Sequence, residues 1–132
     1  MSKLKLKSDE NLNAAQLLIN NQKYNSSVHC SYYGCFQFMK SILCNNLKIG
    51  YDLQDTKKGS DTHDYIFGLL LHTMDNFSMQ RKFRSNFSGL KEKRKRADYE
   101  NALIDITDSL NAIEEARIIM SNLKQAFGPL NI

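Results

Sequence analysis

The chain has 132 residues, of which 42% are hydrophobic and 24% are charged, and it contains a single proline. This length and composition are typical of one globular domain, so we predict that residues 1–132 form a single unit. The longest apolar run, residues 66–71, is far shorter than the roughly 20 apolar residues that span a bilayer, and the basic N-terminus lacks the apolar core of a signal peptide. We therefore expect a cytoplasmic protein that does not enter a membrane.

Apolar residues recur at helical spacing along most of the chain, and no alternating run with turn signals requires a sheet. The predicted helices cover about residues 8–20, 25–45, 61–76, 78–97 and 107–127, with a loop at about 47–60. Ser8 and Ser78 are expected N-caps, Asp61 or Thr62 caps the third helix, and Gly128 ends the last one. Because short connections make neighbouring helices antiparallel, the predicted fold is an all-α, up-and-down antiparallel bundle of four to five helices.

The apolar stripes of these helices predict the core. Its expected members are Val28, Tyr32, Phe36, Met39, Ile66, Leu70, Phe87, Leu90, Ile113 and Met120. Phe38 and Ile42 lie outside the stripe of the second helix, which indicates apolar surface that one bundle does not cover.

Neither the cysteines nor the histidines show the spacing of a metal site. The chain has three of each, namely Cys30, Cys35 and Cys44, and His29, His63 and His72. The odd number of cysteines argues against a disulfide framework, and their apolar surroundings favour packing as small hydrophobic residues. The chain also lacks a phosphate-binding glycine loop and a GxSxG segment, so we expect no metal and no cofactor.

Basic residues cluster in one segment. Eight of the 18 lie between Arg81 and Arg96, where Glu92 is the only acidic residue. Such a cluster attracts phosphate, and it is equally typical of a solvated helix face. Arg94 falls in phase with the apolar residues of its helix, whereas Arg96 points nearly the opposite way. A charge on the inner stripe is costly unless it is paired or lies beside a wet cleft, and Asp98, four residues later, is the candidate partner.

Two segments carry a resemblance to a known family. Residues 14–36 contain A-x-x-L-L, a short turn with Tyr24, and Ser31-Tyr32-Tyr33-Gly34 where an A-Y-Y-A-like core is typical. Residues 94–99 read R-x-x-A-D-Y, and His63 leads the third predicted helix. In this order the segments resemble the HEPN domain family, in particular a branch with the R-x-x-A-D-Y motif that is related to HEPN proteins paired with small nucleotidyltransferases. The resemblance covers about residues 8–127 and implies a HEPN-like bundle.

The resemblance also implies an assembly and a site. Many HEPN proteins are homodimers, and many are RNases in which an R-x(4–6)-H motif supplies an arginine for phosphate charge and a histidine for proton transfer. Arg94 takes the place of that arginine here, but Tyr99 stands five residues later and no histidine follows within six. The candidate catalytic residues are therefore Arg94 and Tyr99, and the candidate ligand-binding residues are Arg94, Asp98, Tyr99, His63 and Tyr33.

Three functions are compatible with this pattern. The first is a module that binds nucleotide or RNA phosphates and acts with a partner such as a nucleotidyltransferase in a toxin–antitoxin or defence-type system. The second is a metal-independent RNase with a degenerate R-x4-Y motif, in which Tyr99 or His63 replaces the missing histidine. The third is a structural protein-interaction module, in which an Arg94–Asp98 pair fixes a helix junction. We predict the first, as a homodimer.

Overall fold

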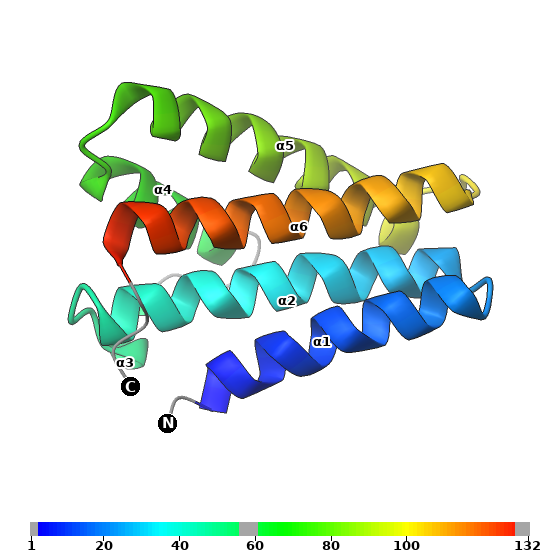
Figure 1. Cartoon of the computed structure of the whole chain (residues 1–132), viewed down its shortest axis with the longest axis horizontal. Helices are drawn as coiled ribbons and strands as arrows, with labels where there is room; N and C mark the ends of the chain where they lie inside the picture. The colour runs from blue at the N-terminus through cyan, green and yellow to red at the C-terminus, as the bar shows by residue number, and fades with distance from the viewer. Residues whose placement is uncertain (1–2, 56–60, 129–132) are drawn as a thin grey trace.

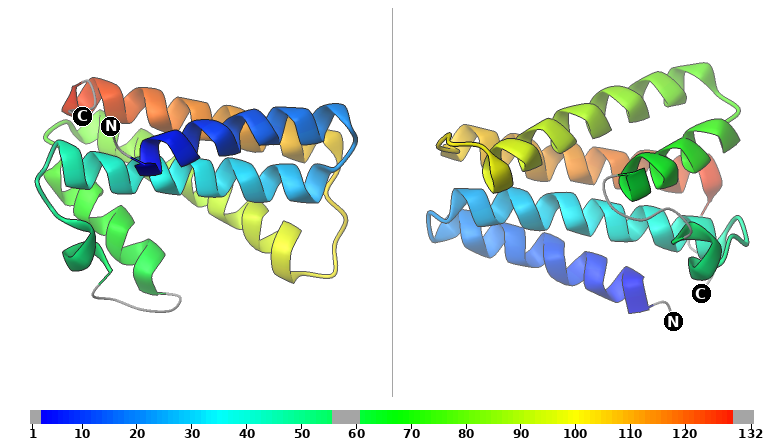
Figure 2. Two further views of the ribbon diagram at one scale, coloured as in Figure 1. Left: turned by 90° about the horizontal axis from the view of Figure 1, so that it is seen from below. Right: turned by 180° about the vertical axis from the view of Figure 1, so that it is seen from behind.

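The computed structural model describes residues 3–55 and 61–128, and within these ranges it contains six helices and no strand. The helices are α1 (Lys3–Asn20), α2 (Tyr24–Asn45), α3 (Tyr51–Gln54), α4 (Asp61–Thr73), α5 (Phe77–Tyr99) and α6 (Ile106–Phe127). Since α3 has only four residues, the prediction of an all-α bundle of four to five helices is confirmed. Figures 1 and 2 show α1, α2 and α6 packed lengthwise, while α4 and α5 diverge from each other on the face behind them.

The central helix is α2, which packs against α1, α4, α5 and α6. All ten predicted core residues are buried. Phe38 and Ile42 are 0% exposed as well, so the prediction that they form uncovered apolar surface is wrong. Helices α1 and α6 of the same chain cover this side of α2: the amines of Lys5 and Lys124 lie 5.8 and 5.7 Å from the centre of the Phe38 ring. These two residues therefore give no support to a dimer.

The first helix begins at Lys3 rather than at Ser8, and Ser8 is not an N-cap. Its buried hydroxyl donates a hydrogen bond of 2.6 Å to the carbonyl of Gly34 in α2. At this point the two helices approach so closely that a Cβ atom on Gly34 would lie 2.3 Å from Cδ2 of Leu12. Ser8 therefore joins α1 to α2, a role that depends on the neighbouring helix and not on the local sequence.

The cap of α5 differs from the predicted one, and the start of α6 differs slightly from the predicted start. Asn76, rather than Ser78, caps α5 by accepting a backbone N–H bond. Asp105 caps α6 and forms a capping box with Asp108, so α6 begins at residue 106 instead of about 107. Gly128 ends α6 as predicted, with a φ of 80° that glycine adopts without strain.

The region around the predicted loop contains one short helix, α3, while residues 56–60 lie outside the described ranges. Helix α4 ends at Thr73, three residues before the expected end, and Thr62 lies inside it rather than at its cap. The three cysteines are free. In the part of the chain that the structure describes, no helix combines the length and the apolarity needed to cross a bilayer.

Candidate functional site

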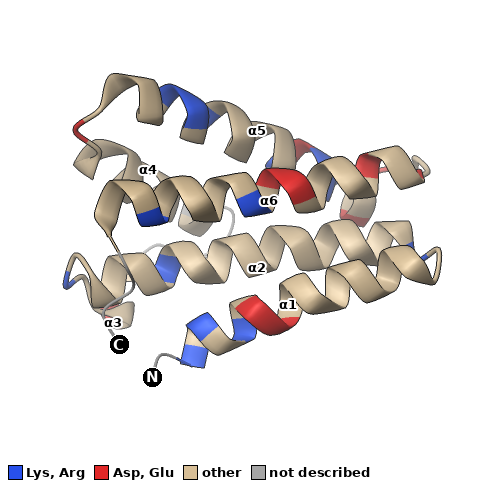
Figure 3. Cartoon of the chain, in the orientation of Figure 1, with Lys and Arg blue, Asp and Glu red and all other residues tan. Residues whose placement is uncertain are grey.

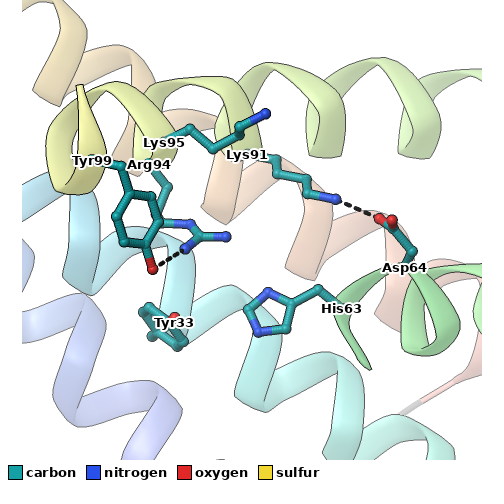
Figure 4. A pocket seen from close by; sticks show the side chains of 7 residues that line it. All are labelled: Tyr33, His63, Asp64, Lys91, Arg94, Lys95 and Tyr99. Carbon is teal, nitrogen blue, oxygen red and sulfur yellow. Dashed lines mark hydrogen bonds and ion pairs between the residues drawn. The ribbon is translucent and has the colours of Figure 1, made fainter. Parts of the chain in front are cut away.

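A pocket of about 570 Å³ lies between α4 and the second half of α5. The first turn of α4 is linked to the second half of α5 by the ion pair between Asp64 and Lys91. The residues that line the pocket are Tyr33 from α2, His63 and Asp64 from α4, and Lys91, Arg94, Lys95 and Tyr99 from α5. In Figure 4 the guanidinium of Arg94 and the imidazole of His63 both lie at the inner wall of this pocket.

Arg94 is the buried charge of the pocket. Its helical phase places it in line with the apolar residues of α5, and it is only 7% exposed. Its guanidinium carbon lies 4.6 Å from the centre of the Tyr32 ring, 5.3 Å from that of Tyr99 and 5.9 Å from that of Tyr33. Its Nη1 donates a hydrogen bond of 3.1 Å to the Tyr99 hydroxyl. Aromatic faces thus surround the cation and partly replace its hydration.

The candidate pair between Arg94 and Asp98 does not form. The Asp98 carboxylate instead lies 2.9 Å from Nδ1 of His29 on α2. Within the described residues Arg94 makes no ion pair, and its buried Nε has no hydrogen-bond partner. The third function, a helix junction fixed by this pair, loses its basis.

Comparison with protein families connects this geometry to a known group. The family model for the HEPN domain matches residues 1–126, nearly the whole chain. The chain belongs to the HEPN domain family. No curated protein matches it significantly. The family membership agrees with the resemblance inferred from residues 14–36 and 94–99, while assignment to the R-x-x-A-D-Y branch stays a prediction.

In this HEPN domain a histidine reaches the pocket from α4, although none follows Arg94 in the sequence. The His63 ring stacks on Phe36, with ring centres 4.2 Å apart, and its Nδ1 lies 2.5 Å from the Tyr32 hydroxyl. Burial, together with the charges of Arg94 and Lys91, lowers the pKa of His63 to about 4. The imidazole is therefore neutral at neutral pH.

The protonation state of Tyr32 determines which group donates in the hydrogen bond between Tyr32 and His63. Burial raises the pKa of its hydroxyl well above the usual value, although the charge of Arg94 opposes the change. We therefore assign the Tyr32 hydroxyl as the donor and Nδ1 of His63 as the acceptor, which places the imidazole proton on Nε2. Because Nδ1 accepts the hydrogen bond of Tyr32, His63 can donate a hydrogen bond to a ligand through Nε2–H.

The rim of the HEPN pocket is basic and aromatic. Lys91 pairs with Asp64, whereas Lys95 is exposed and makes no ion pair with any described residue. Tyr99 is 73% exposed, and the Tyr33 ring meets the Tyr32 ring edge-on, with centres 5.2 Å apart. The pocket thus combines cations with aromatic faces, which suits a phosphate attached to a base or a sugar.

Four of the five candidate residues, Arg94, Tyr99, His63 and Tyr33, line this single pocket, and Asp98 does not. The sequence analysis missed Asp64, Lys91, Lys95 and the contact of Tyr32 with both Arg94 and His63. A signal for the two lysines exists in the sequence, because Lys91 stands three residues before Arg94 and Lys95 four residues before Tyr99, and these spacings place side chains next to each other on a helix. No sequence signal identifies Asp64, since its place depends on how α4 packs against α5.

Proposed function

We propose that this HEPN domain binds phosphate groups of RNA or of a nucleotide in the pocket around Arg94. The observation that carries this proposal is a buried guanidinium without a carboxylate partner among the described residues. A buried charge is costly unless it is paired. A bound phosphate would provide the missing countercharge and would accept the planar array of N–H donors that a guanidinium presents.

The surroundings of Arg94 support the same ligand. Lys91 and Lys95 add positive charge at the rim, and His63 offers a neutral N–H donor at Nε2. The exposed ring of Tyr99 and the ring of Tyr33 offer faces on which a base or a ribose would pack. Together these groups form a site for an anion that carries a flat or apolar part.

Metal-independent RNA cleavage is the second candidate, and the presence of His63 in the pocket favours it. The chemistry would need a group that accepts the proton of a ribose 2′-hydroxyl as it attacks phosphorus. The hydrogen bond between Tyr32 and Nδ1 engages the only unprotonated nitrogen of His63, and a hydroxyl such as that of Tyr99 is a weak base at neutral pH. Binding without cleavage is therefore the function that the geometry supports best.

Membership of the HEPN family supports two further parts of the proposal. We propose that the domain works as a homodimer and that it acts with a nucleotidyltransferase in a toxin–antitoxin or defence-type system. Light scattering that reports only the 15.2 kDa monomer at every concentration would contradict the dimer. Failure of the two purified proteins to associate would contradict the partnership.

The binding proposal is tested by Arg94→Ala, with Arg96→Ala as the matched control. Both variants remove one positive charge from α5, but Arg96 pairs with Asp108 of α6 and does not line the pocket. We expect Arg94→Ala to weaken binding of uridine monophosphate by about 1.5–3 kcal/mol, or roughly 10- to 150-fold, because it removes charge-assisted hydrogen bonds. Arg96→Ala should change the affinity by less than about threefold, because Arg96 acts on the ligand only through a long-range electric field that salt screens.

The measurement is a calorimetric titration at fixed salt, with circular dichroism to confirm folding. Equal affinities in folded Arg94→Ala and Arg96→Ala would contradict the proposed site. Incubation of a labelled RNA pool with excess chelator separates the two candidate functions. If the wild-type protein cleaves the RNA specifically and Arg94→Ala does not, RNase activity replaces binding as the function of the pocket.

A further inference from the structure

The exposed side of α5 carries a second feature that continues from the pocket. The buried residues of this helix, Phe83, Phe87, Leu90 and Arg94, follow one another at spacings of four, three and four. The positions directly after them, together with two earlier ones in the same phase, form a neighbouring row about 100° around the helix. We call this row the α5 stripe; it consists of Phe77, Arg81, Arg84, Ser88, Lys91 and Lys95.

The α5 stripe is basic and faces solvent over most of its length. Phe77, Arg81, Arg84, Ser88 and Lys95 are all exposed. Among the ion pairs of the described residues, only the pair between Lys91 and Asp64 involves the stripe. Two carboxylates of α5 lie near it: Glu92 on its flank, and Asp98, which continues its phase three residues beyond Lys95 and pairs with His29 of α2. Four cations thus lie in one row, and three of them have no ion-pair partner in the described part of the chain.

The end of the α5 stripe that lies far from the pocket carries an aromatic ring. Phe77 is 71% exposed, and the guanidinium carbon of Arg81 lies 5.9 Å from the centre of its ring. These two residues border a shallow hollow of about 460 Å³ whose other walls are polar or basic: Ser78, Lys82, Ser85 and Asn86. An exposed phenylalanine beside an arginine offers a surface on which a nucleic-acid base would stack.

The opposite end of the α5 stripe enters the candidate site, because Lys91 and Lys95 line the pocket around Arg94. From Phe77 to Lys95 the helix rises by about 27 Å. A mononucleotide in the pocket would leave most of this length unused, whereas a single strand would place successive phosphates along it. Figure 3 shows basic positions in both the first and the second half of α5.

We propose that the α5 stripe is a track for a single RNA strand, with one phosphate in the Arg94 pocket and a base several nucleotides away stacked on Phe77. This proposal rests on the proposed function and names its ligand as an oligonucleotide rather than a free nucleotide. Single-strand sites combine a basic path for the backbone with aromatic side chains for the bases, and the α5 stripe has both.

The test compares two double variants of the full chain. Arg81→Ala/Arg84→Ala removes two charges from the α5 stripe. The matched control, Lys93→Ala/Arg96→Ala, removes two charges from the same helix on the side that faces α6, where these residues pair with Glu115 and Asp108. The probes are an end-labelled octamer of uridine, measured by fluorescence anisotropy, and uridine monophosphate, measured by calorimetry, with circular dichroism to confirm folding.

We expect the octamer to bind wild-type protein at least about tenfold more tightly than uridine monophosphate does, since it adds phosphate contacts and a stacked base. The stripe variant should weaken octamer binding by about tenfold or more and leave the affinity for uridine monophosphate unchanged. It should also reduce the slope of log affinity against log salt by about 1.4, because two contacts of about 0.7 each are lost. The control should keep the wild-type slope.

Phe77 provides a separate readout. Phe77→Ala should weaken octamer binding by about tenfold without a change in the salt slope, and Phe77→Tyr should retain the wild-type affinity because it keeps the ring. Equal losses of octamer binding in the stripe variant and in its control would overturn the track, as would an octamer that binds no more tightly than uridine monophosphate.

The outcomes keep the two proposals apart. If Arg94→Ala abolishes binding of uridine monophosphate while the stripe variant binds the octamer normally, the pocket is retained and the track is wrong. If the stripe variant no longer binds the octamer while Arg94→Ala binds both probes normally, the proposed binding site in the pocket is wrong. A track that ends in this pocket is then wrong as well.

Discussion

The two flanks of α5 have similar charge but different environments. On the flank that faces α6, Lys93 pairs with Glu115 at 2.8 Å and Arg96 pairs with Asp108 at 3.2 Å. On the opposite flank Lys95 makes no ion pair with a described residue, and Lys91 pairs with the exposed Asp64. One basic segment of the sequence therefore contains cations that pair across two helices and cations that have few or no ion-pair partners among the described residues.

This difference teaches that the helical period, not the density of charge, decides what each basic residue does. Lys93, Arg94 and Lys95 are consecutive, yet the first pairs with α6, the second is buried among tyrosines, and the third is exposed at the pocket rim. The two interpretations of the cluster thus concern different sides of one helix: the side that faces α6 is an ordinary helix face, and the other side is the one for which we propose phosphate binding.

The larger of two effects that distinguish the flanks concerns His63, which lies near Lys91 and not near the flank of α5 that faces α6. The charged or titratable groups that face it are Tyr32 and Lys40 from α2, Asp64 from its own helix, and Lys91 and Arg94 from α5. Its pKa is about 4 in the folded chain and 6.5 in the reference state. Between these values the unfolded chain binds more protons than the folded chain does, so the free energy of unfolding falls as the pH drops from 6.5 to 4.

Because the imidazole is only half-buried, solvent screening reduces this effect, and we expect a loss of ~1–2 kcal/mol over that interval. Denaturant titrations at several pH values measure it, and His63→Gln should remove most of the dependence. In Lys91→Ala the NMR titration of His63 should move to higher pH, whereas in Lys93→Ala it should not. A His63 that titrates near 6.5 in the wild-type chain would contradict the assigned environment.

A smaller effect comes from removing one carboxylate on each flank. Glu115→Gln leaves the partly buried Lys93 without its partner, so we expect the free energy of unfolding to fall by about 1 kcal/mol and the affinity for uridine monophosphate to stay the same. Asp64→Asn releases Lys91 at the pocket, so we expect binding about threefold tighter and a stability change below about 0.5 kcal/mol. Thermal melts and binding titrations on both variants measure the contrast, and the opposite pattern would reverse the roles of the two flanks.

Much of the fold follows from the sequence because local rules determine it. The apolar period predicted α2 and α6 to within about a residue and placed Arg94 among the buried residues. Ser8 fails as a cap because its hydroxyl reaches Gly34 across the helix pair. Ser78 fails because α5 begins at Phe77. Asn76 therefore stands at the N-cap, and its side chain accepts the backbone N–H bond of Met79.

The candidate site could be predicted only in part, since its contacts join helices that are distant in the sequence. The spacing rule offered Asp98 as the partner of Arg94, but Asp98 meets His29, 69 positions away. His63 was expected in the site from the family resemblance, and its position beside Tyr32 became visible only in three dimensions. Sequence patterns indicate which face of a helix a residue occupies, and they do not indicate what lies opposite.

The central claim is that Arg94 is a buried charge kept for an anion and not for the fold. Arg94→Met tests it most directly, because methionine keeps most of the volume and the contact with Tyr32 while it removes the charge. A denaturant titration without ligand and a calorimetric titration with uridine monophosphate are measured on the same variant. We predict that the free energy of unfolding stays within about 1 kcal/mol of wild type or rises, and that the affinity falls at least about tenfold. A loss of stability of about 3 kcal/mol with unchanged affinity per folded molecule would show that Arg94 serves the fold, and it would contradict the proposed site.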